Sequence, residues 1–347
     1  SSTVVFHRLG EASLFGDESI YALTSRESVK RDTWLPLYKA SGQLYDKGWF
    51  FEWDGRRYRF KTEPSLNKIV SDEMDMIGRV KAKEELDRRI RTVWKSGVLR
   101  VVPFPQEASD VADDAGPPKL AILHYDAAKV TALEPRPPEL ARKIAQRSGT
   151  LEGFRRFRNS VLLLLADDDR VENAVPVAQR YLAISRITGD AERLQGFTKE
   201  QRKKLKKMGE AAELDVRVAI TRTYRHLYFP RSDAPKRDAN LQHDMLPAQE
   251  QGEVEKDQSA VVLRALALQQ KTLTGDSPTL AAAYVRTKAW DQNAVTMSTE
   301  DLRKAFARRL GLPILLDINQ LKERITQQIE EKISKQQREF FLREQLK

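Results

Sequence analysis

The sequence predicts an α/β fold in which a mostly parallel sheet is flanked by helices. The main observation is the unbroken apolar run 161–165, VLLLL, which has the length of a strand and is too short for a globular helix. A strand without polar alternation is covered on both faces, as in parallel sheets between helix layers. Asp167, Asp168, Asp169 and then a helical pattern follow, and this succession forms half of a doubly wound unit.

Composition narrows the class of protein. The chain has 347 residues, of which 40% are hydrophobic and 32% charged, and this length predicts more than one domain. Its net charge of +10 favours an acidic partner, with nucleic acid ahead of a membrane surface, and a solvated basic surface is the alternative. The absence of cysteine excludes disulfides, thiolate zinc sites and cysteine nucleophiles, and it agrees with a reducing compartment.

The ends of the chain and its hydropathy pattern bear on localisation. No apolar run is long enough to span a bilayer and no signal peptide opens the chain, so we expect a cytoplasmic protein without a membrane segment. The first residue is not methionine and the last residues continue a helical pattern, from which we expect a piece of a longer protein.

Residues 1–70 are expected to form a winged-helix-like module, because two helix candidates precede the segment WFFEWDGRRYRFKT. Asp54-Gly55 indicates a two-residue type I′ hairpin turn, which would place Trp53 opposite Arg56 and give the hairpin an aromatic and a basic face. We predict that the cations of this hairpin contact nucleic-acid phosphates, and the alternative is a protein-docking module. These cations are Arg56, Arg57, Arg59 and Lys61.

The α/β domain is expected over residues 71–230. Before the central run we predict helices at 64–94 (one long or two short) and 139–146, strands at 98–102 and 120–123, and a surface loop at 106–118. Asp113 and Asp114 in this loop could bind a cation, although a solvated acidic loop is the commoner case.

A basic helix is predicted after the central strand and its helix. Thr198 and Gln201 have capping-box spacing, and the helix should extend from Thr198 to about residue 218. Its lysines are predicted to assist nucleic-acid binding, with a solvated helix face as the alternative. They are Lys203, Lys204, Lys206 and Lys207. Residues 218–221 and 224–229 are predicted to be extended.

The remainder is expected to be a polar linker followed by helices. Residues 231–259 indicate a mobile loop or linker, and 260–316 a helical region. From residue 317 to 347 a single narrow apolar stripe predicts a projecting or coiled helical arm, through which the chain could form a homo-oligomer.

The motifs do not support catalysis within this chain. GxxxxGK[ST] and GxSxG are both absent, and the histidines lack metal-ligand spacing. VLLLLADDD is similar to the strand and acid of a Walker B segment, so Asp167 and Asp169 are candidate Mg²⁺ ligands of a nuclease or nucleotide site. The alternative is that these carboxylates cap the helix that follows them, and no other cofactor is expected.

Several segments resemble a family of large bacterial P-loop ATPases found near DNA methyltransferases in phage-defence clusters, related to the ATPases of bacteriophage-exclusion and phage-growth-limitation systems. The matching segments span most of residues 1–316 and are WFFEWDGRRYRFKTEPSLNKIV, VVPFPQEASDVADD followed by PKLAIL, FRNSVLLLLADDDRVENAVPVAQRYLAI, and LRKAFARRLGLPILLD. The resemblance implies a region downstream of the family's P-loop, so the ATPase activity itself does not carry over to this chain.

The last segment is similar to a different family. QIEEKISKQQREFFLREQLK, residues 328–347, resembles the coiled arm that precedes the ATPase module of Lon protease. Lon's P-loop and Ser-Lys dyad are absent from this sequence, so proteolysis is not implied. Because the two families are not expected in one natural chain, we expect an engineered fusion or a hybrid of two segments joined near residues 316–328, and the alternative is a chance coiled-coil likeness.

These observations predict a non-catalytic, nucleic-acid-binding or regulatory portion of a phage-defence-type ATPase. Nucleic acid is the expected partner, other subunits of a defence complex are further partners, and no membrane is involved. Two alternatives remain open: a metal-dependent nuclease or nucleotide site at the acidic strand end, and an oligomerisation or substrate-contacting arm of a Lon-like ATP-dependent protease.

Overall fold

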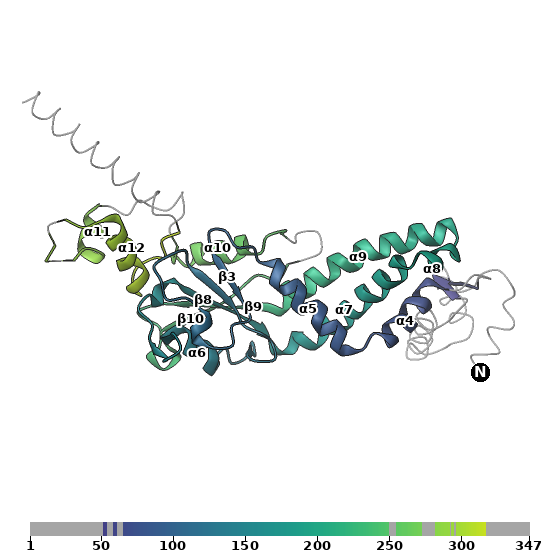
Figure 1. Cartoon of the computed structure of the whole chain (residues 1–347), viewed down its shortest axis with the longest axis horizontal. Coiled ribbons are helices and arrows are strands. Elements are labelled where there is room, and N and C mark those ends of the chain that lie inside the picture. Colours follow the sequence, from purple (N-terminus) through teal and green to yellow (C-terminus); the bar gives the residue numbers. More distant parts are fainter. Residues whose placement is uncertain are drawn as a thin grey trace, which may run out of the picture. The chain divides into compact units, whose positions relative to one another are not determined.

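The predicted α/β fold is confirmed by the computed structural model, in which a mixed, mostly parallel sheet is flanked by helices (Figure 1). The structure describes residues 51–53, 58–60, 65–249, 255–272, 282–291, 293–294 and 296–316. Most of the predicted winged-helix module and the whole of the predicted arm 317–347 lie outside the described residues.

The central sheet is built around the apolar run that the sequence singled out. In spatial order its strands are β10 (Leu241–Met245), β9 (Tyr224–Pro230), β8 (Val161–Asp167), β4 (Lys119–Ile122) and β3 (Arg100–Pro103), and β5 (Lys129–Val130) also pairs with β8. The strands β3, β4, β5 and β8 run parallel, whereas β9 and β10 are antiparallel to their neighbours. Every residue of β8 is buried, which confirms the prediction of a central strand covered on both faces.

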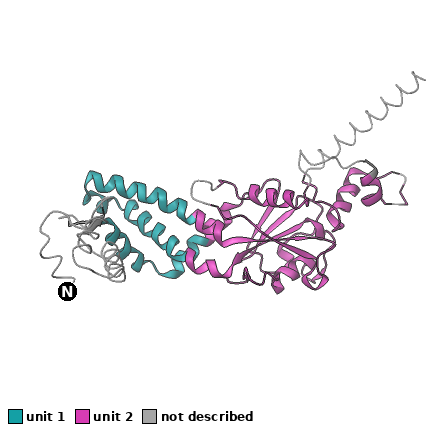
Figure 2. Cartoon of the chain, turned by 180° about the vertical axis from the view of Figure 1, so that it is seen from behind, with its two compact units in different colours: residues 1–86, 175–216 teal, residues 87–174, 217–347 magenta. Residues whose placement is uncertain are grey.

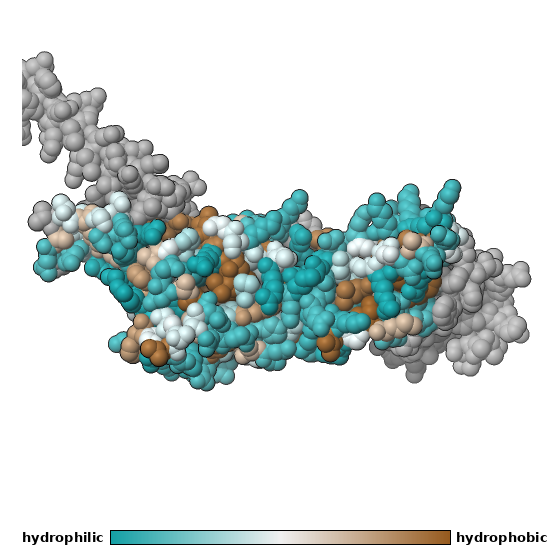
Figure 3. Space-filling model, viewed as in Figure 1, coloured by the Kyte–Doolittle hydropathy of each residue, from teal (hydrophilic) through white to brown (hydrophobic). Residues whose placement is uncertain are grey.

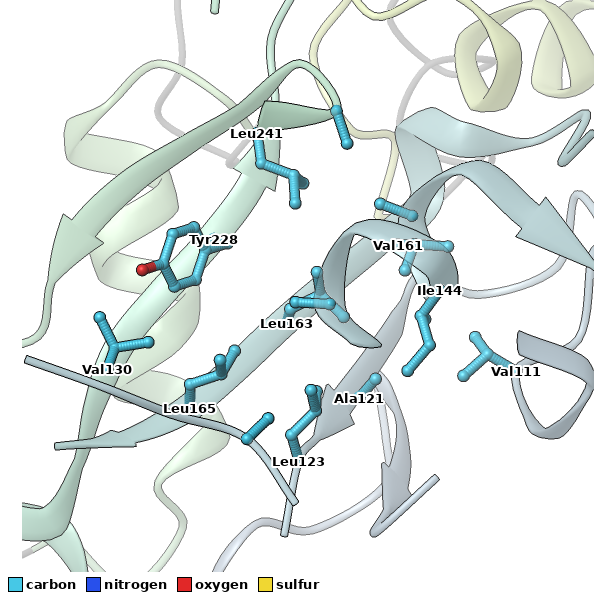
Figure 4. Close-up of a cluster of buried hydrophobic side chains, with 14 residues drawn as sticks. Val111, Ala121, Leu123, Val130, Ile144, Val161, Leu163, Leu165, Tyr228 and Leu241 are labelled. Atoms are coloured by element: carbon cyan, nitrogen blue, oxygen red, sulfur yellow. The ribbon is translucent and has the colours of Figure 1, made fainter. Parts of the chain in front are cut away.

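Helices cover both faces of this sheet. On one face α6 (Glu139–Gln146) packs Ile144 against a cluster that includes Leu163, Leu165 and Tyr228 (Figure 4). The alternate residues of β8 point to the other face and are also fully buried. Helix α10 (Ser259–Leu268) lies on that side (Figure 1). The central strand therefore has no solvent-facing side, as its uniform apolar composition requires.

The chain divides into two compact units (Figure 2). Unit 1 comprises residues 1–86 and 175–216, and unit 2 comprises residues 87–174 and 217–347. Among the described residues, the helices that lie wholly or partly in unit 1 are α4 (Leu66–Met76), α5 (Arg79–Val93), α7 (Asp168–Gly189), α8 (Ala191–Gln195) and α9 (Lys199–Thr223). The predicted helix 64–94 is thus a pair of shorter helices, the second of the two forms expected.

Unit 1 has its own apolar core and a buried ion-pair cluster. Val70, Ile184 and Leu205, which come from three different helices, are fully buried in this core. Glu73 is buried on α4 and pairs with Arg186 at 3.1 Å and with Arg193 at 2.6 Å. Because a buried carboxylate without a partner would be destabilising, these two arginines are what permit an acidic residue at this position.

Helix α9 begins as predicted and ends later than predicted. The backbone N–H of Thr198 donates to the Gln201 side chain at 3.1 Å, and the Gln201 N–H donates to Thr198 Oγ1 at 3.2 Å, so the capping box is confirmed. The prediction of extended structure at 218–221 is wrong, because the helix continues to Thr223. Val216, Val218 and Ile220 are all buried. When the end of a helix is buried on several sides, its apolar residues can alternate in the sequence as they do in a strand.

The segment 231–259 differs from the expected mobile loop or linker, because it contributes a strand to the sheet. Strand β10 pairs with β9 through a register that runs from Leu241 opposite Pro230 to Met245 opposite His226. The polar composition that suggested a linker belongs to an edge strand, which needs only one buried face.

The predicted hairpin is present with a different register. Strand β1 (Phe51–Trp53) pairs antiparallel with β2 (Tyr58–Phe60), and Trp53 lies opposite Tyr58, so the connection is longer than the predicted two-residue turn. A shift of the pairing by two residues preserves the alternation of each strand, which is why the sequence pattern alone could not choose between the two registers.

The other described elements are short. They are the 3₁₀ helices η1 (Ala108–Asp110), η2 (Arg158–Ser160) and η3 (Lys236–Asp238), the strand pair β6 (Arg147–Ser148) and β7 (Gly153–Phe154), and the helices α11 (Ala282–Lys288) and α12 (Thr299–Arg308). The side chain of Ser298 caps α12 by accepting from the N–H of Asp301 at 3.1 Å.

Candidate functional site

The acidic end of β8 forms a helix cap. Asp167 is buried, and its Oδ1 accepts a hydrogen bond from the backbone N–H of Asp169 at 3.1 Å, at the start of α7. Asp168 forms an ion pair with Lys129 at 2.5 Å, and Asp169 is exposed. Within the described residues, no group of at least three His, Cys, Asp or Glu side chains is placed to hold a metal ion. The geometry supports capping directly, and Mg²⁺ binding by Asp167 and Asp169 stays a prediction.

A histidine pair lies beside this cap on the neighbouring strands. His226 of β9 places its Nε2 3.8 Å from Asp167 Oδ2, and its Nδ1 lies 2.9 Å from Nε2 of His243 on β10. Burial lowers the pKa of His226 despite the opposing effect of Asp167, and burial lowers the pKa of His243 to about 4. Both imidazoles are therefore neutral at pH 7, so one ring nitrogen can donate and the other accept.

The sequence did not reveal this pair. The histidines lack metal-ligand spacing in the sequence, and His243 lies inside the expected linker. Their contact depends on the antiparallel pairing of β9 with β10, in which His243 lies opposite Tyr228. Two short alternating segments joined through a Pro- and Asn-containing turn, TYRHLYFP and LQHDM, are the signal that could have predicted a hairpin here.

Aromatic residues fill the same edge of the sheet. His124 follows β4, lies 3.2 Å from a carboxylate oxygen of Asp87, and stacks on Tyr125 with ring centroids 4.3 Å apart. The Tyr224 hydroxyl donates to the carbonyl of Leu123 at 3.0 Å, and its ring meets that of Trp94 edge to face. This carboxyl-terminal edge, where open α/β sheets usually bind ligands, is thus occupied by the chain's own packed side chains.

The acidic loop 106–118 is neutralised from within the protein. Asp113 accepts hydrogen bonds from the backbone N–H groups of Arg156 (2.8 Å) and Phe157 (2.9 Å), and it lies 4.0 Å from the buried Arg155 guanidinium. Asp114 pairs with the buried ammonium of Lys119 at 2.6 Å. Burial lowers the pKa of Lys119, and hydrogen bonding to Asp114 opposes that effect. The loop is therefore held by internal cations.

The structure describes some of the predicted nucleic-acid-binding residues and not others. Arg56, Arg57 and Lys61 lie outside the described residues, and Arg59 lies in β2 opposite Glu52 of β1. The α9 lysines are all exposed, and they are Lys203, Lys204, Lys206 and Lys207. The structure brings these four together on one helix.

Helical spacing places more cations on this surface than the sequence analysis named. Positions three, four, seven and eight residues apart share one side of a helix, so Lys199 and Arg202 join three of the predicted lysines. This basic stripe consists of Lys199, Arg202, Lys203, Lys206 and Lys207. It lies opposite Leu205 and Ala212, which are buried in the unit 1 core. Hydrophilic side chains project along the outer side of α9 in Figure 3.

Comparison with known proteins adds no relative. No protein-family model, curated protein or solved structure matches the chain. Within the described part of the chain, no helix is long and apolar enough to cross a membrane.

Proposed function

We propose that the chain is a non-catalytic portion of a DNA-associated ATPase that binds the nucleic-acid backbone. The observation that carries this proposal is the basic stripe on α9. Its five cations are presented on the exposed side of one helix, from Lys199 to Lys207. Backbone binding requires cations that follow a line of phosphates and needs no pocket, which agrees with an exposed helix face.

The position of the stripe in the helix argues against a purely stabilising role. The amino terminus of a helix carries partial positive charge, so acidic residues stabilise its first turns and basic residues do not. In α9 the first two turns are dominated by lysine and arginine, with Glu200 as the acidic residue of the first turn. An anion bound at this end would satisfy both the side chains and the helix dipole.

The lysines of the stripe are not neutralised by carboxylates in the described part of the chain. Among the residues that the structure describes, Lys203, Lys206 and Lys207 form no ion pair with a carboxylate. This contrasts with Lys119 and Lys129, whose ammonium groups pair with Asp114 and Asp168. Unpaired surface cations retain their charge for an external partner.

Charge reversal of the stripe tests the proposal. In Lys203→Glu/Lys206→Glu/Lys207→Glu we expect nucleic-acid affinity to fall and the slope of log K against log salt to decrease by about one unit for each lysine that contacts a phosphate. Fluorescence anisotropy with labelled single-stranded and duplex oligonucleotides, over a salt series, measures both quantities and distinguishes the form of nucleic acid.

A matched variant controls for net charge. Arg142→Glu/Arg170→Glu/Lys236→Glu changes the charge by the same amount at exposed positions of unit 2. If both triple variants lose affinity equally, attraction is diffuse and the stripe has no special role. Failure of the unmodified protein to bind any oligonucleotide at low salt contradicts the proposal outright.

The hairpin cations belong to the same proposal. Arg57→Glu/Arg59→Glu is expected to weaken binding further, because Arg59 and the α9 stripe both belong to unit 1.

The resemblance to phage-defence ATPases supports DNA as the nucleic acid and subunits of a defence complex as protein partners. The Lon-like tail supports a second role as an oligomerisation arm, which sizing of the chain with and without residues 317–347 would test.

One observation favours a metal site as the second candidate function. Asp167 lies at the carboxyl end of a parallel strand, the position of metal-binding acids in many α/β enzymes. Titration with Mg²⁺ and Mn²⁺, followed by calorimetry, decides between capping and coordination. Bound metal that is lost in Asp167→Ala establishes a site, whereas no heat of binding leaves capping as the role of this carboxylate.

A further inference from the structure

A cavity in unit 2 has three arginines in its lining. Its volume is about 630 Å³, and it lies between the segment that leads into η2 and helix α12. Arg156 comes from the first side, and Arg308 and Arg309 come from the end of α12. All three arginines are exposed to solvent, so a ligand can reach them.

Two of these arginines share one aromatic ring. The guanidinium carbon of Arg308 lies 5.2 Å from the centroid of the Phe157 ring, and that of Arg156 lies 5.7 Å from the same centroid. Each contact is favourable, because the face of an aromatic ring attracts a cation. Two like charges gathered at one ring nevertheless repel each other, and an anion bound between them would remove that repulsion.

The acidic residues around the cavity are already engaged. Asp291 accepts from the backbone N–H of Asn293 at 3.1 Å, and Asp301 accepts from the Ser298 hydroxyl at 2.6 Å. Lys304, which also lines the cavity, pairs with Glu300 at 2.8 Å. Within the described residues, Arg156, Arg308 and Arg309 form no ion pair with a carboxylate. The cavity has a surplus of positive charge, because its lining holds more cations (Arg156, Lys304, Arg308 and Arg309) than carboxylates (Asp291 and Asp301).

Both walls of the cavity are held in place by hydrogen-bonded polar side chains. Asp113 accepts the backbone N–H groups of Arg156 and Phe157, which fixes the first wall. Asn159 is buried, and its side-chain amide donates to the carbonyl of Phe306 on α12 at 2.8 Å, which fixes the second wall to the first. Arg309 also donates to the carbonyl of Lys288. Positioned donors bind a ligand with less loss of conformational entropy than mobile ones.

We propose that this arginine cavity binds a phosphate group. A planar guanidinium forms paired, charge-assisted hydrogen bonds with phosphate oxygens, and several converging arginines are the usual way in which proteins bind such groups. The phosphate could belong to a nucleic-acid strand or to a free nucleotide, since the recognised chemistry is the same. The proposal is independent of the basic stripe, which belongs to unit 1.

Phosphate probes and conservative variants test the cavity. Calorimetry measures the binding of three probes: pyrophosphate, ATP without metal and a short oligothymidylate. We expect at least one of them to bind. Arg156→Gln or Arg308→Gln should weaken that binding about tenfold, because each removes a charge-assisted hydrogen bond to the phosphate. Phe157→Leu keeps all the charges and removes the ring that positions them, so it should also weaken binding.

Controls separate this site from the α9 stripe and from misfolding. Arg142→Gln removes an equally exposed arginine on α6 and should leave binding unchanged. Lys203→Glu/Lys206→Glu/Lys207→Glu should leave pyrophosphate binding unchanged even if it abolishes oligonucleotide binding. Circular dichroism identifies a variant that has lost its fold rather than its ligand. Arg308→Lys retains the positive charge and serves as the conservative variant at this position.

Each outcome decides the proposal. Loss of oligonucleotide binding in the cavity variants assigns the phosphate to a strand, and loss of ATP or pyrophosphate binding alone assigns it to a free nucleotide or its phosphates. Absence of binding by all three probes, or binding that Arg156→Gln and Arg308→Gln leave unaltered, overturns the proposal without affecting that of the stripe.

Discussion

Two acidic segments of unit 2, the loop 106–118 and the turn that follows β8, have similar compositions and opposite surroundings. In the loop, Asp113 and Asp114 meet the cations Arg155 and Lys119. In the turn, the buried Asp167 meets a backbone N–H group and the neutral imidazole of His226.

The difference shows that a run of acids does not define a site. In the loop, internal cations remove the charge that would attract an external metal ion. In the turn, a helix amino terminus stabilises the Asp167 carboxylate without a full positive charge, and only the neighbouring Asp168 pairs with a cation, Lys129. The electrostatic role of each carboxylate is thus decided by its tertiary neighbours, and mutations of those neighbours should affect the two segments to different extents.

The largest effect is expected at Arg155. Its side chain is fully buried and donates to the carbonyls of Ala108, Val111, Ala112 and Ile144. Arg155→Leu would remove this donor from all four carbonyls, of which that of Ala108 keeps the Val111 N–H at 3.4 Å, and should lower the free energy of unfolding by about 4 kcal/mol. Urea denaturation measures the change, with Arg142→Leu on the exposed side of α6 as the control. A loss no larger than that of the control would mean that the loop does not depend on this arginine.

A smaller, pH-dependent effect is expected at the histidine pair. Because burial lowers the pKa of His243 to about 4, the unfolded chain binds more protons than the folded chain between that pH and the ordinary histidine value of about 6.5. The free energy of unfolding is therefore highest above about pH 6.5 and falls as the pH is lowered to about 4, by less than about 3 kcal/mol because solvent screens this partly exposed side chain.

The comparison variant is His243→Gln, which retains a side-chain hydrogen bond and does not titrate. Its unfolding free energy should depend less steeply on pH in this window than that of the unmodified protein. Chemical denaturation at several pH values provides the measurement. Equal slopes in the two proteins would show that the pair does not couple protonation to folding.

The smallest effect is expected at the helix cap. Asp167→Ala removes the acceptor for the Asp169 N–H and should destabilise the protein by about 1 kcal/mol, whereas Asp167→Asn retains an acceptor and should lose less. Asp169→Ala changes an exposed side chain and should stay within about 0.5 kcal/mol of the unmodified protein. A larger loss at Asp169 than at Asp167 would reverse the ranking that the structure implies.

Local signals predicted those elements whose formation depends on neighbouring residues. The helix Glu139–Gln146 has the predicted bounds, the capping box at Thr198 is present, and the apolar run 161–165 is the central strand. Each signal consists of residues within a few positions of one another, so its energetic basis is contained in the local sequence.

Local signals failed where distant partners decide the structure. Extended structure was predicted at 218–221, but burial from several sides keeps this segment helical. The polar segment that contains His243 joins the sheet only because β9 offers it a free edge. The candidate sites follow the same division: the lysines of α9 were visible in the sequence, whereas Arg156 and Arg308 lie 152 positions apart and meet only at Phe157.

The sequence by itself determined that the chain forms an α/β sheet around residues 161–165, that a basic helix follows, and that no P-loop is present. Only the tertiary structure decided which carboxylates are neutralised, which cations remain exposed and which arginines surround a common cavity. The reason is that hydrophobic periodicity is a local property of the chain, whereas the charge balance at any point is a sum over residues that folding brings together.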